Sequence, residues 1–383
     1  MQSWLSEIRR DFHRHPETAF EEFRTTERIR TILQELNVQI LDLPGLETGV
    51  VGLIQGDASG PVLGLRADID ALPLQELSDV PYASTVQGKM HACGHDAHAA
   101  IMLGVAKKIM DDGLASHLRG SVKFIFQPAE EGIAGARRMI EHGVLDNPRM
   151  DRILAGHMIN DLPCGSIGWF EGPSHAATDM FTLEITGQGT HGARPHQGRD
   201  PIVAGAHFVT AVQSIVSRNL SPMDSGVISV GAFHAGTASN IIPAAVRLNG
   251  TIRSLQTEVR EMLFNRLREC AAGLETMFGV KTDIQFKEGA PPNVNDLEVS
   301  RSLAEAAETV LGKEGALLIP PSMGGEDFAL FTEQIPGAMI RIGSGNQAEG
   351  KTQPLHSPYF DIDERSLVHG VEVFVQAVKT YLS

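Results

Sequence analysis

The sequence predicts an α/β protein built on a mostly parallel sheet, with a smaller domain inserted into it. Through the first 175 residues, short apolar runs alternate with segments of helical spacing, which is typical of a parallel sheet with crossover helices. From residue 176 to 291 the order becomes strand, helix, strand, strand, helix, strand, as in a ferredoxin-like βαββαβ sandwich. We therefore expect one domain over residues 1–175 and 292–383, and a second over residues 176–291.

The first domain opens with two helices and continues into strands. Leu5, Ile8 and Phe12 recur at helical spacing and stop before Pro16, and a second helix is expected over residues 21–36. Four apolar runs then predict strands, namely TGVVGLIQ, PVLGLRAD, GSVKFIFQ and DRILAGHM. Helical segments such as AAIMLGVAKKIM and GARRMIEHGV lie between the later runs.

The insertion has its own set of elements, after which the chain completes the first domain. Its expected elements are MFTLEITG, a helix over 201–219, GVISVGAF, AAVRLNGTIR, a helix over 258–278, and VKTDIQFKE. Asp200 and Pro201 suit the N-cap and first turn of the first of these helices. Beyond the insertion we expect a helix, a glycine-rich loop, the strand GAMIRIG and a closing helix with Val368, Val371 and Val375 on one face.

The composition excludes several classes of protein. The 383 residues carry a formal charge of −15 without a cluster of Lys and Arg, which disfavours nucleic acid and anionic membranes as partners. No apolar stretch is long enough to span a membrane, and the N-terminus lacks the apolar core of a signal peptide. Three cysteines argue against a disulfide framework, and Cys164 and Cys270 have the surroundings of inert thiols. We expect a cytoplasmic protein that acts on a small molecule.

Polar motifs follow or close three of the expected strands. RADID ends the second strand, QPAEEG follows the third and GHMIN closes the fourth. In open α/β sheets the carboxyl ends of the strands form the crevice in which ligands bind. The three motifs are therefore expected to share one cleft.

The segment HACGHDAH is dense in side chains that bind transition metals. It holds Cys93, His95 and His98 next to the carboxylate of Asp96. The alternative is that this is the polar start of a surface helix. His91, Asp96 and His98 are interpreted as supporting or surface groups, so Cys93 and His95 are the candidate ligands.

Further candidate ligands lie far along the chain. In QPAEEG, Glu130 and Glu131 point in divergent directions, so one can bind a metal while the other faces a reacting water. An acidic pair at a helix start is more often structural, and a lone histidine such as His157 or His356 is usually a hydrogen-bonded structural group. The total argues otherwise, because five suitable ligands are enough for two metals: Cys93, His95, Glu131, His157 and His356.

Nine motifs occur in order along the chain, namely RADIDALP, HACGHDAH, QPAEEG, GHM, GTHGARPH, NIIP, GTIR, MGGEDFALF and LHSPYFDID. With them the chain resembles the amidohydrolase branch of the dinuclear-metal aminoacylase and carboxypeptidase family, which includes hippurate hydrolases and indole-acetyl-amino-acid hydrolases. The resemblance covers almost the whole chain. It implies a metallopeptidase-type catalytic domain, and it implies that the insertion is a lid and dimerisation domain.

The resemblance also implies roles for the candidate residues. The metal ligands would be Cys93, His95, Glu131, His157 and His356. Glu130 would be the general base and Asp70 a carboxylate that orients a ligand. Relatives in the wider family carry His at the place of Asp68 and Asp at the place of His95, so the chain follows the cysteine-containing branch.

In the insertion, the resemblance points to residues that contact substrate. His191 would stabilise the oxyanion, often in the partner subunit's active site, and Asn240 and Arg253 would bind substrate carboxylate or transition-state oxygen. Without the resemblance, these would be a loop Asn and a strand-end surface Arg. Gly325 would belong to a pocket loop whose backbone amides approach a carboxylate. The alternative is a helix N-terminus with acidic residues in its first turn.

The predicted function is hydrolysis of the amide bond of an N-acyl amino acid, hippurate-like or N-acetylated, to a carboxylate and a free amino acid. Two divalent cations per subunit are expected, Zn or Mn, with Co or Ni also suited to the ligands. The resemblance implies a homodimer or higher oligomer formed through the lid. The alternatives are a di- or carboxypeptidase, and a noncatalytic binder of metal or amino acid. Glu130 beside a complete ligand set favours an enzyme, because a binder has no use for a general base.

Overall fold

The computed structural model describes residues 1–57 and 59–382, which form two compact units. The first unit comprises Met1–Gly172, Asn295–Pro320 and the chain from Asp327 onward, and the second comprises Pro173–Val294 and Pro321–Glu326. The expected boundaries lie within three residues of two of these limits. The short segment 321–326 was not foreseen as part of the second unit.

An eight-stranded mixed sheet forms the centre of the first unit. Its strands are β1 (Gln39–Leu41), β2 (Val50–Gln55), β3 (Val62–Asp68), β4 (Ser121–Gln127), β5 (Arg152–Pro163), β6 (Ile167–Trp169), β15 (Ala316–Leu318) and β16 (Gly337–Gly345). They lie in the order β1-β2-β4-β3-β5-β16-β6-β15. The central four, β4, β3, β5 and β16, are parallel to one another, and antiparallel pairs occur only towards the edges. The expected mostly parallel sheet is therefore confirmed.

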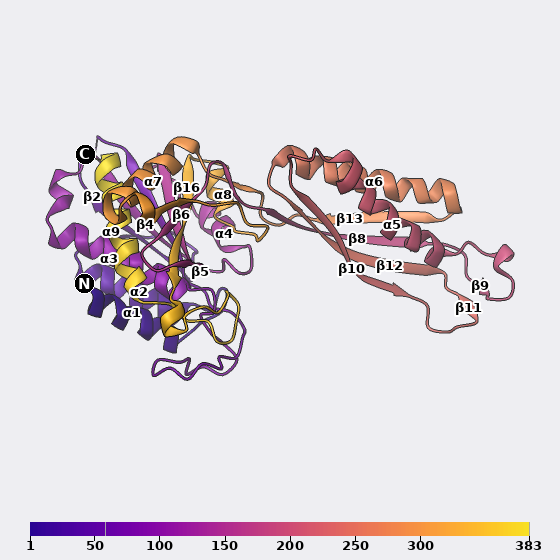
Figure 1. Cartoon of the computed structure of the whole chain (residues 1–383), viewed down its shortest axis with the longest axis horizontal. Helices are drawn as coiled ribbons and strands as arrows, with labels where there is room; N and C mark the ends of the chain where they lie inside the picture. Colours follow the sequence, from indigo (N-terminus) through magenta and orange to yellow (C-terminus); the bar gives the residue numbers. More distant parts are fainter. Residues whose placement is uncertain (58, 383) are drawn as a thin grey trace. The chain divides into compact units, whose positions relative to one another are not determined.

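Helices cover both faces of this sheet. They are α1 (Gln2–Arg14), α2 (Phe23–Glu35), α3 (His95–Asp111), α4 (Gly135–Glu141), α7 (Leu297–Leu311), α8 (Ala329–Thr332) and α9 (Arg365–Leu382), with short 3₁₀ turns at Leu114–His117, Lys313–Gly315 and Gln347–Glu349. The helices α1, α2, α3, α7 and α9 share one core, whereas α4 and α8 pack on the opposite face. Figure 1 shows α1 and α9, the first and last helices, on the same side of this unit.

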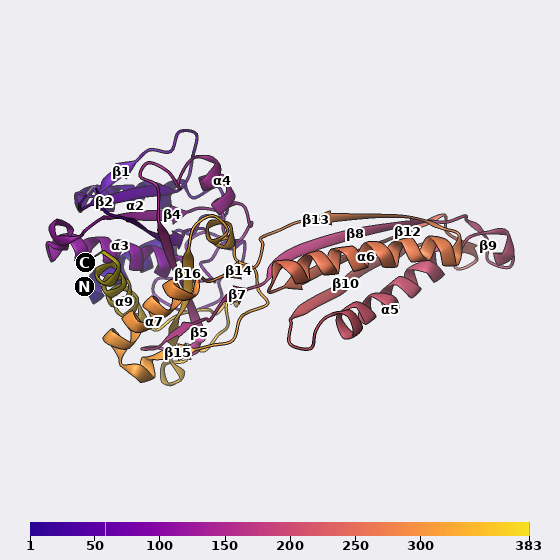
Figure 2. The ribbon, with the colours of Figure 1, turned by 90° about the horizontal axis from the view of Figure 1, so that it is seen from above.

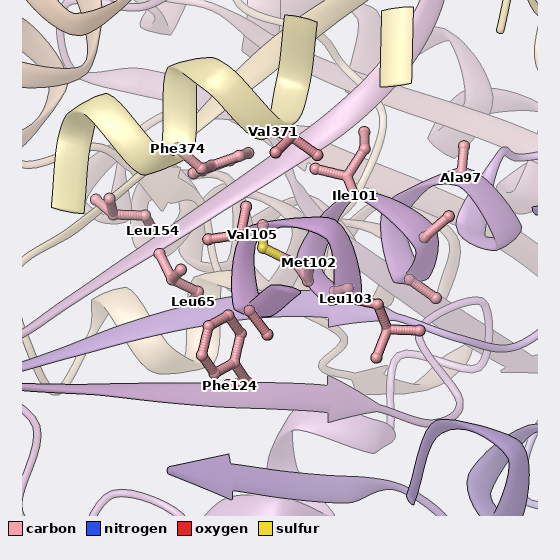
Figure 3. Close-up of a cluster of buried hydrophobic side chains, with 14 of the residues drawn as sticks. Leu65, Ala97, Ile101, Met102, Leu103, Val105, Phe124, Leu154, Val371 and Phe374 are labelled. Atoms are coloured by element: carbon pink, nitrogen blue, oxygen red, sulfur yellow. The ribbon is translucent and has the colours of Figure 1, made fainter. Parts of the chain in front are cut away.

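The apolar runs become strands because both of their faces are buried. In β4, Phe124 and Phe126 enter the core beneath α3 and α9, and Ile125 between them enters the smaller core on the other face. Figure 3 shows Phe124 near Leu65 of the neighbouring strand and Val105 of α3. A sheet covered on both sides removes the alternation of polar and apolar residues, which explains why these strands read as continuous apolar runs.

The second unit is a βαββαβ sandwich. It contains β7 (Pro173–His175), β8 (Ala177–Thr186), β9 (Thr190–His191), a 3₁₀ turn (Pro195–Gln197), α5 (Pro201–Asn219), β10 (Gly226–Ala235), β11 (Ile241–Ile242), β12 (Ala245–Ser254), α6 (Thr257–Phe278), β13 (Lys281–Lys287) and β14 (Asn293–Val294). The antiparallel sheet has the order β10-β12-β8-β13, and α5 and α6 lie side by side on one of its faces (Figure 2). Asp200 caps α5 through the N–H groups of Ile202 and Val203, as its sequence position predicts.

Two expectations about strand ends need correction. The fourth strand does not close at GHMIN, because β5 continues to Pro163 along its parallel neighbour β16. His157 therefore lies inside β5. In the second unit, β7 pairs with β14, so the ladder that closes the insertion starts before residue 176 and ends after residue 291. Within residues 1–57 and 59–382, each helix is too short or too polar to cross a membrane.

Candidate metal centre

Separate segments of the first unit bring polar side chains to the carboxyl edge of the parallel strands. β3 ends at Asp68, and Glu130 and Glu131 lie in the loop after β4. His95 is the first residue of α3. In the parallel pairing of β3 with β5, Arg66 lies opposite Ala155. Two residues further along, His157 is therefore level with Asp68 at the end of β3. His157 lies inside a strand, and it comes close to candidate ligands outside the strands because β5 extends beyond the end of its neighbour β3.

The remaining candidate ligand comes from the loop between β16 and α9. His356 has φ of 64°, a left-handed conformation that is uncommon outside glycine. Its backbone N–H donates to the carbonyl oxygen of Ala92 at 2.8 Å, so the His356 segment is fastened next to Cys93. The hydrogen bond fixes where this distant part of the chain meets the start of α3.

All five candidate ligands come together in two groups that share one residue. Cys93, His95 and His157 offer ligand atoms within 4.8 Å of one another, and Cys93, Glu131 and His356 do the same. Cys93 Sγ lies 3.5 Å from His157 Nε2. The arrangement has the number and kinds of donor expected for two neighbouring cations, with Cys93 common to both groups.

The two buried histidines among the candidate ligands, His95 and His157, each make a hydrogen bond through Nδ1. His95 Nδ1 lies 2.9 Å from the carbonyl oxygen of Asp70, and His157 Nδ1 lies 2.8 Å from that of Met158. A carbonyl only accepts, so each Nδ1 carries a proton, and in the neutral ring each Nε2 then presents a lone pair. Metal-binding histidines in proteins are usually held in this way.

Orphaned polar atoms in the site fit bound cations. Within residues 1–57 and 59–382, His95 Nε2 and Glu131 Oε1 are buried without a hydrogen bond of good geometry, although Glu131 Oε1 lies 3.4 Å from His356 Nε2. Burial raises the pKa of the Cys93 thiol to about 12, so the thiolate needs a compensating positive charge. Two divalent cations would bind the buried ligand atoms and balance the charge of the thiolate. The residues present therefore fit the metals that the sequence predicts.

Glu130 lies beside the candidate ligands, and with His95 and Glu131 it forms a further group whose ligand atoms lie within 4.8 Å of one another. Its carboxylate is buried, and Oε2 lies 4.0 Å from His95 Nε2. Asp70 accepts the backbone N–H of Glu131 at 3.0 Å and also lies 3.3 Å from His95 Nδ1. Asp70 therefore contacts the ring of one candidate ligand and the backbone of another.

The sequence did not predict the hydrogen bonds that join His98 to Asp68 and to the backbone of β5. Asp68 accepts hydrogen bonds from His98 Nδ1 and from Arg66, and His98 Nε2 accepts the backbone N–H of Met158 at 2.8 Å. Both nitrogens of His98 are therefore engaged, and the ring supports β5 next to His157. The signal available in the sequence was Asp68 itself, an acidic residue at the end of an apolar strand.

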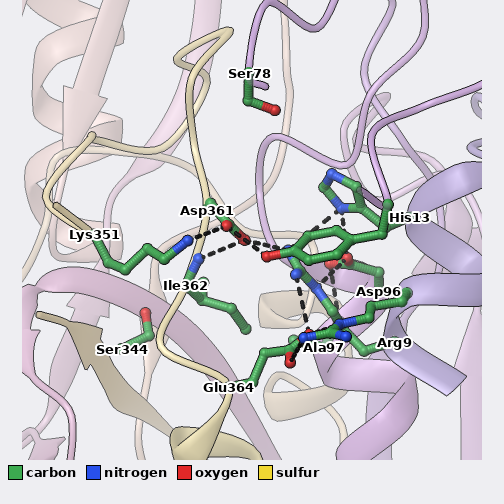
Figure 4. A network of polar contacts seen from close by, with 12 residues as sticks. Arg9, His13, Ser78, Asp96, Ala97, Ser344, Lys351, Asp361, Ile362 and Glu364 are labelled. Carbon is green, nitrogen blue, oxygen red and sulfur yellow. Dashed lines mark hydrogen bonds and ion pairs between the residues drawn. The ribbon is translucent and has the colours of Figure 1, made fainter. Parts of the chain in front are cut away.

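A second buried network underlies the start of α3 (Figure 4). The Arg9 guanidinium, with no exposed surface, contacts Asp96 at 2.8 Å, Asp361 at 3.0 Å and Glu364 at 3.4 Å. Asp96 also accepts from His13 at 2.7 Å. Arg9 therefore joins the segment of His95 to the segment that follows His356. Asp96, like His91 and His98, is buried, which excludes the surface interpretation of all three.

In the second unit, His191 and Asn240 are neighbours. β9 pairs with β11, and the N–H of Gly192 donates to the carbonyl oxygen of Asn240 at 2.7 Å. His191 is exposed, and its Nδ1 accepts the N–H of Ala193 at 3.0 Å. The neutral ring therefore carries its proton on Nε2, which is free to donate outward.

Arg253 and Gly325 meet at Thr178, also in the second unit. Arg253 pairs with Thr178 across β12 and β8. A Cβ on Gly325 would lie 2.2 Å from Thr178 Cγ2, so this close approach requires glycine. The alternative of a helix with acidic residues in its first turn does not hold, because α8 begins only at Ala329, after the buried Asp327.

Known proteins resemble this chain over nearly its full length. The sequence profile of peptidase family M20/M25/M40 matches residues 64–380. An N-acetylcysteine deacetylase of Bacillus subtilis is 41% identical over 372 residues, covering 97% of this chain and 95% of its own. The IAA-amino acid hydrolase ILR1-like 4 of Arabidopsis thaliana is 36% identical and covers 99% of this chain and 86% of its own.

A solved structure matches in the same way. The YXEP protein of Bacillus subtilis, described as a dinuclear metal binding peptidase of the M20 family, superposes with a TM-score of 0.86 at 37% identity and covers 99% of this chain and 98% of its own. Both the sequence profile and the identities extend through the segments that carry all the candidate ligands. The protein belongs to peptidase family M20/M25/M40.

Proposed function

We propose that the protein is a metal-dependent amidohydrolase that cleaves N-acyl amino acids, with Cys93, His95, Glu131, His157 and His356 holding two divalent cations. The observation that carries the proposal is the buried Glu130 beside a complete set of ligands. A binding protein needs the ligands alone. The relatives named as a deacetylase of N-acetylcysteine and a hydrolase of indole-acetyl-amino acids support this class of substrate.

Glu130 is proposed to carry the proton through the reaction. When bound, the cations supply positive charge that polarises the amide carbonyl and lowers the pKa of water. Glu130 takes the proton of the attacking water and returns it to the leaving nitrogen, which avoids expelling an unstable amide anion. Free carboxylate and amino acid result.

The second unit is proposed to bind substrate and the developing oxyanion. His191 Nε2–H would donate to the oxyanion. The hydrogen bond from Ala193 to Nδ1 supports this, because it favours the tautomer with the proton on Nε2. Arg253 and Asn240 would bind the substrate carboxylate, with the backbone around Gly325 forming part of the pocket wall. In this proposal the second unit acts as the lid of the enzyme.

We further propose a homodimer formed through α5 and the free edge of β10. Ile202, Val203 and Phe233 are exposed there, and a hollow of about 490 Å³ lies between the helix and the strand. Apolar side chains next to an unpaired strand edge suit a second copy of the same surface.

The cysteines in the described residues are unpaired, which supports a cytoplasmic setting.

The test is a paired measurement of turnover and metal content. Glu130→Gln is expected to lower kcat by about 100 to 10,000-fold, the usual contribution of a general base, while its metal content stays equal to wild type. Unchanged turnover at equal metal content would remove Glu130 from the mechanism. The substrate panel is N-acetyl and N-benzoyl amino acids against dipeptides, each assayed with Zn, Mn, Co and Ni after chelation. Faster cleavage of the dipeptides would favour the peptidase alternative.

A further inference from the structure

Glu22 is a fully buried acid outside the candidate metal centre that contacts the loop after β4. It immediately precedes α2 and has no exposed surface. Its Oε1 accepts two backbone N–H groups, from Phe20 at 3.0 Å and from Ala129 at 2.9 Å. Ala129 directly precedes Glu130. One carboxylate oxygen therefore joins the start of α2 to the loop that carries the proposed base.

Both residues that donate to Glu22 have an unfavourable backbone. Phe20 has φ of 60° and Ala129 has φ of 54°, and neither is glycine. Such conformations persist only where the surroundings hold them in place, and they are often found at functional sites. The shared acceptor explains how both are held, because a single oxygen satisfies the two N–H groups that the turned backbone directs inward.

The loop is held at alternate amides by two carboxylates. Glu22 accepts from Ala129, and Asp70 accepts from Glu131. The residue between them is Glu130. Asp70 also contacts His95, so it is part of the metal centre itself, whereas Glu22 approaches from the opposite end of the loop. With both ends fixed, the peptide plane that orients Glu130 has little freedom to turn.

We propose that Glu22 is a positioning residue for Glu130 and Glu131, acting through the backbone N–H of Ala129. The proposal rests on the proposed function, because it needs Glu130 to be the base and Glu131 to be a ligand. Glu22 itself touches neither substrate nor metal. Displacing a reacting group by about 1 Å can cost about 100-fold in rate, and this is the scale of effect expected from loss of the contact.

A matched pair of variants tests the contact. Glu22→Gln keeps an oxygen that accepts both N–H groups, and Glu22→Met fills the same space without an acceptor. We expect kcat of Glu22→Met to fall by about 100-fold with KM changed little, and metal affinity measured by chelator competition to fall as well. Glu22→Gln should stay within about threefold of wild type. Glu21→Gln, which alters the exposed neighbouring acid, is the surface control.

The outcomes separate this proposal from the proposed function. Wild-type kcat and metal affinity in Glu22→Met, or equal losses in Glu22→Met and Glu22→Gln, would overturn the positioning role. If Glu22→Met does not fold, Glu22→Asp replaces it, since the shorter side chain cannot span both amides; wild-type kcat in that variant would overturn the role equally. Glu130→Gln is run in parallel, and full activity there refutes the proposed function whatever Glu22 does.

Discussion

At the scale of single residues, the candidate centre combines one thiol with imidazole and carboxylate donors. Cys93 is buried, and it is common to both ligand groups. Sulfur favours softer ions such as Zn²⁺, whereas oxygen suits harder ions such as Mn²⁺. If Cys93 is a ligand as proposed, its sulfur should favour Zn²⁺ over Mn²⁺ at this site.

Replacing that atom tests the dependence. Cys93→Ser is expected to weaken Zn²⁺ binding by at least about tenfold and to weaken Mn²⁺ binding less, because the hydroxyl is a poorer partner for the softer ion. Competition with a chelator measures both affinities. An equal loss for the two ions would show that the thiol does not set the preference.

The buried acid Glu22 gives a prediction about pH. Burial raises the pKa of Glu22 from its ordinary 4.5 to about 7, with the charge of Asp70 adding to the effect. Between these values the folded protein keeps a proton that the unfolded chain releases, so stability falls as pH rises from about 4.5 to 7. The cost is complete above pH 7 and amounts to at most about 3 to 4 kcal/mol at 1.36 kcal/mol per pKa unit.

Glu22→Gln removes this cost because an amide does not ionise. In metal-free protein, the stability of the variant relative to wild type should therefore increase from pH 5 to pH 8. Urea unfolding at both values measures it. A difference that is the same at both pH values would mean that Glu22 stays ionised, or stays protonated, throughout.

The sequence pointed to the candidate ligands more readily than to the residues that contact them. Cys93 and His95 are conspicuous because Cys and His are rare in such density, whereas Glu131 became a candidate only together with the other motifs. Glu22 is one of two adjacent acids, and the sequence alone does not tell that one is exposed and the other buried. The burial of Glu22 and the exposure of Glu21 arise from the turn at Phe20, which has a positive φ. Because the residue in this turn is not glycine, the sequence gives no sign of the turn.

At the scale of elements, apolar periodicity located most of the helices and the longer strands, because burial of one or both faces determines the spacing of apolar residues. It did not locate the short strands β1, β6, β7, β9, β11, β14 and β15, and it misplaced the end of β5. The polar residues after Met158 suggested a loop, but pairing with β16 supplies their backbone hydrogen bonds. Long-range pairing of this kind has no local signature in the sequence.

The contacts of α1 with α3 and the final loop lead to another prediction. Arg9→Met should destabilise the protein by about 3 to 5 kcal/mol, because it removes the buried guanidinium that pairs with the carboxylates of Asp96, Asp361 and Glu364. Arg24→Met is the control, since Arg24 is 39% exposed and pairs outside the Arg9 network with Asp11, which is 26% exposed; such surface pairs contribute about 0 to 1 kcal/mol. Urea unfolding compares the two. Equal effects would mean that the Arg9 network adds no more than a surface ion pair.

At the scale of the whole molecule, the proposed dimer and the proposed oxyanion donor can be tested together. If His191 serves the partner subunit's site, mixing inactive Glu130→Ala with inactive His191→Ala should restore activity, because some mixed dimers then hold one intact site. The assay follows N-acetyl amino acid hydrolysis after subunit exchange. No recovery after confirmed exchange would place His191 in its own subunit's site or outside the mechanism.

The surface of the proposed dimer has its own test. Val203→Glu puts a charge among the exposed apolar side chains of α5 and should convert a dimer to a monomer. Sedimentation velocity measures the change. Met277→Glu alters a more exposed apolar side chain on α6 that does not line the hollow, and it should leave the oligomer intact. If both variants behave alike, the α5 and β10 surface is not the interface.

The position of β16 in the sheet bears on how the protein is made. This strand lies between β5 and β6, yet it follows β5 by more than 170 residues of chain. During synthesis, β5 therefore emerges long before the neighbour that covers its edge, and a whole second unit is translated in between. Until residues 337–345 leave the ribosome, that edge is open to pairing with other chains. A nascent or prematurely terminated chain therefore exposes the unpaired edge of β5. Such a chain should bind chaperones and should be degraded by proteases sooner than the complete protein.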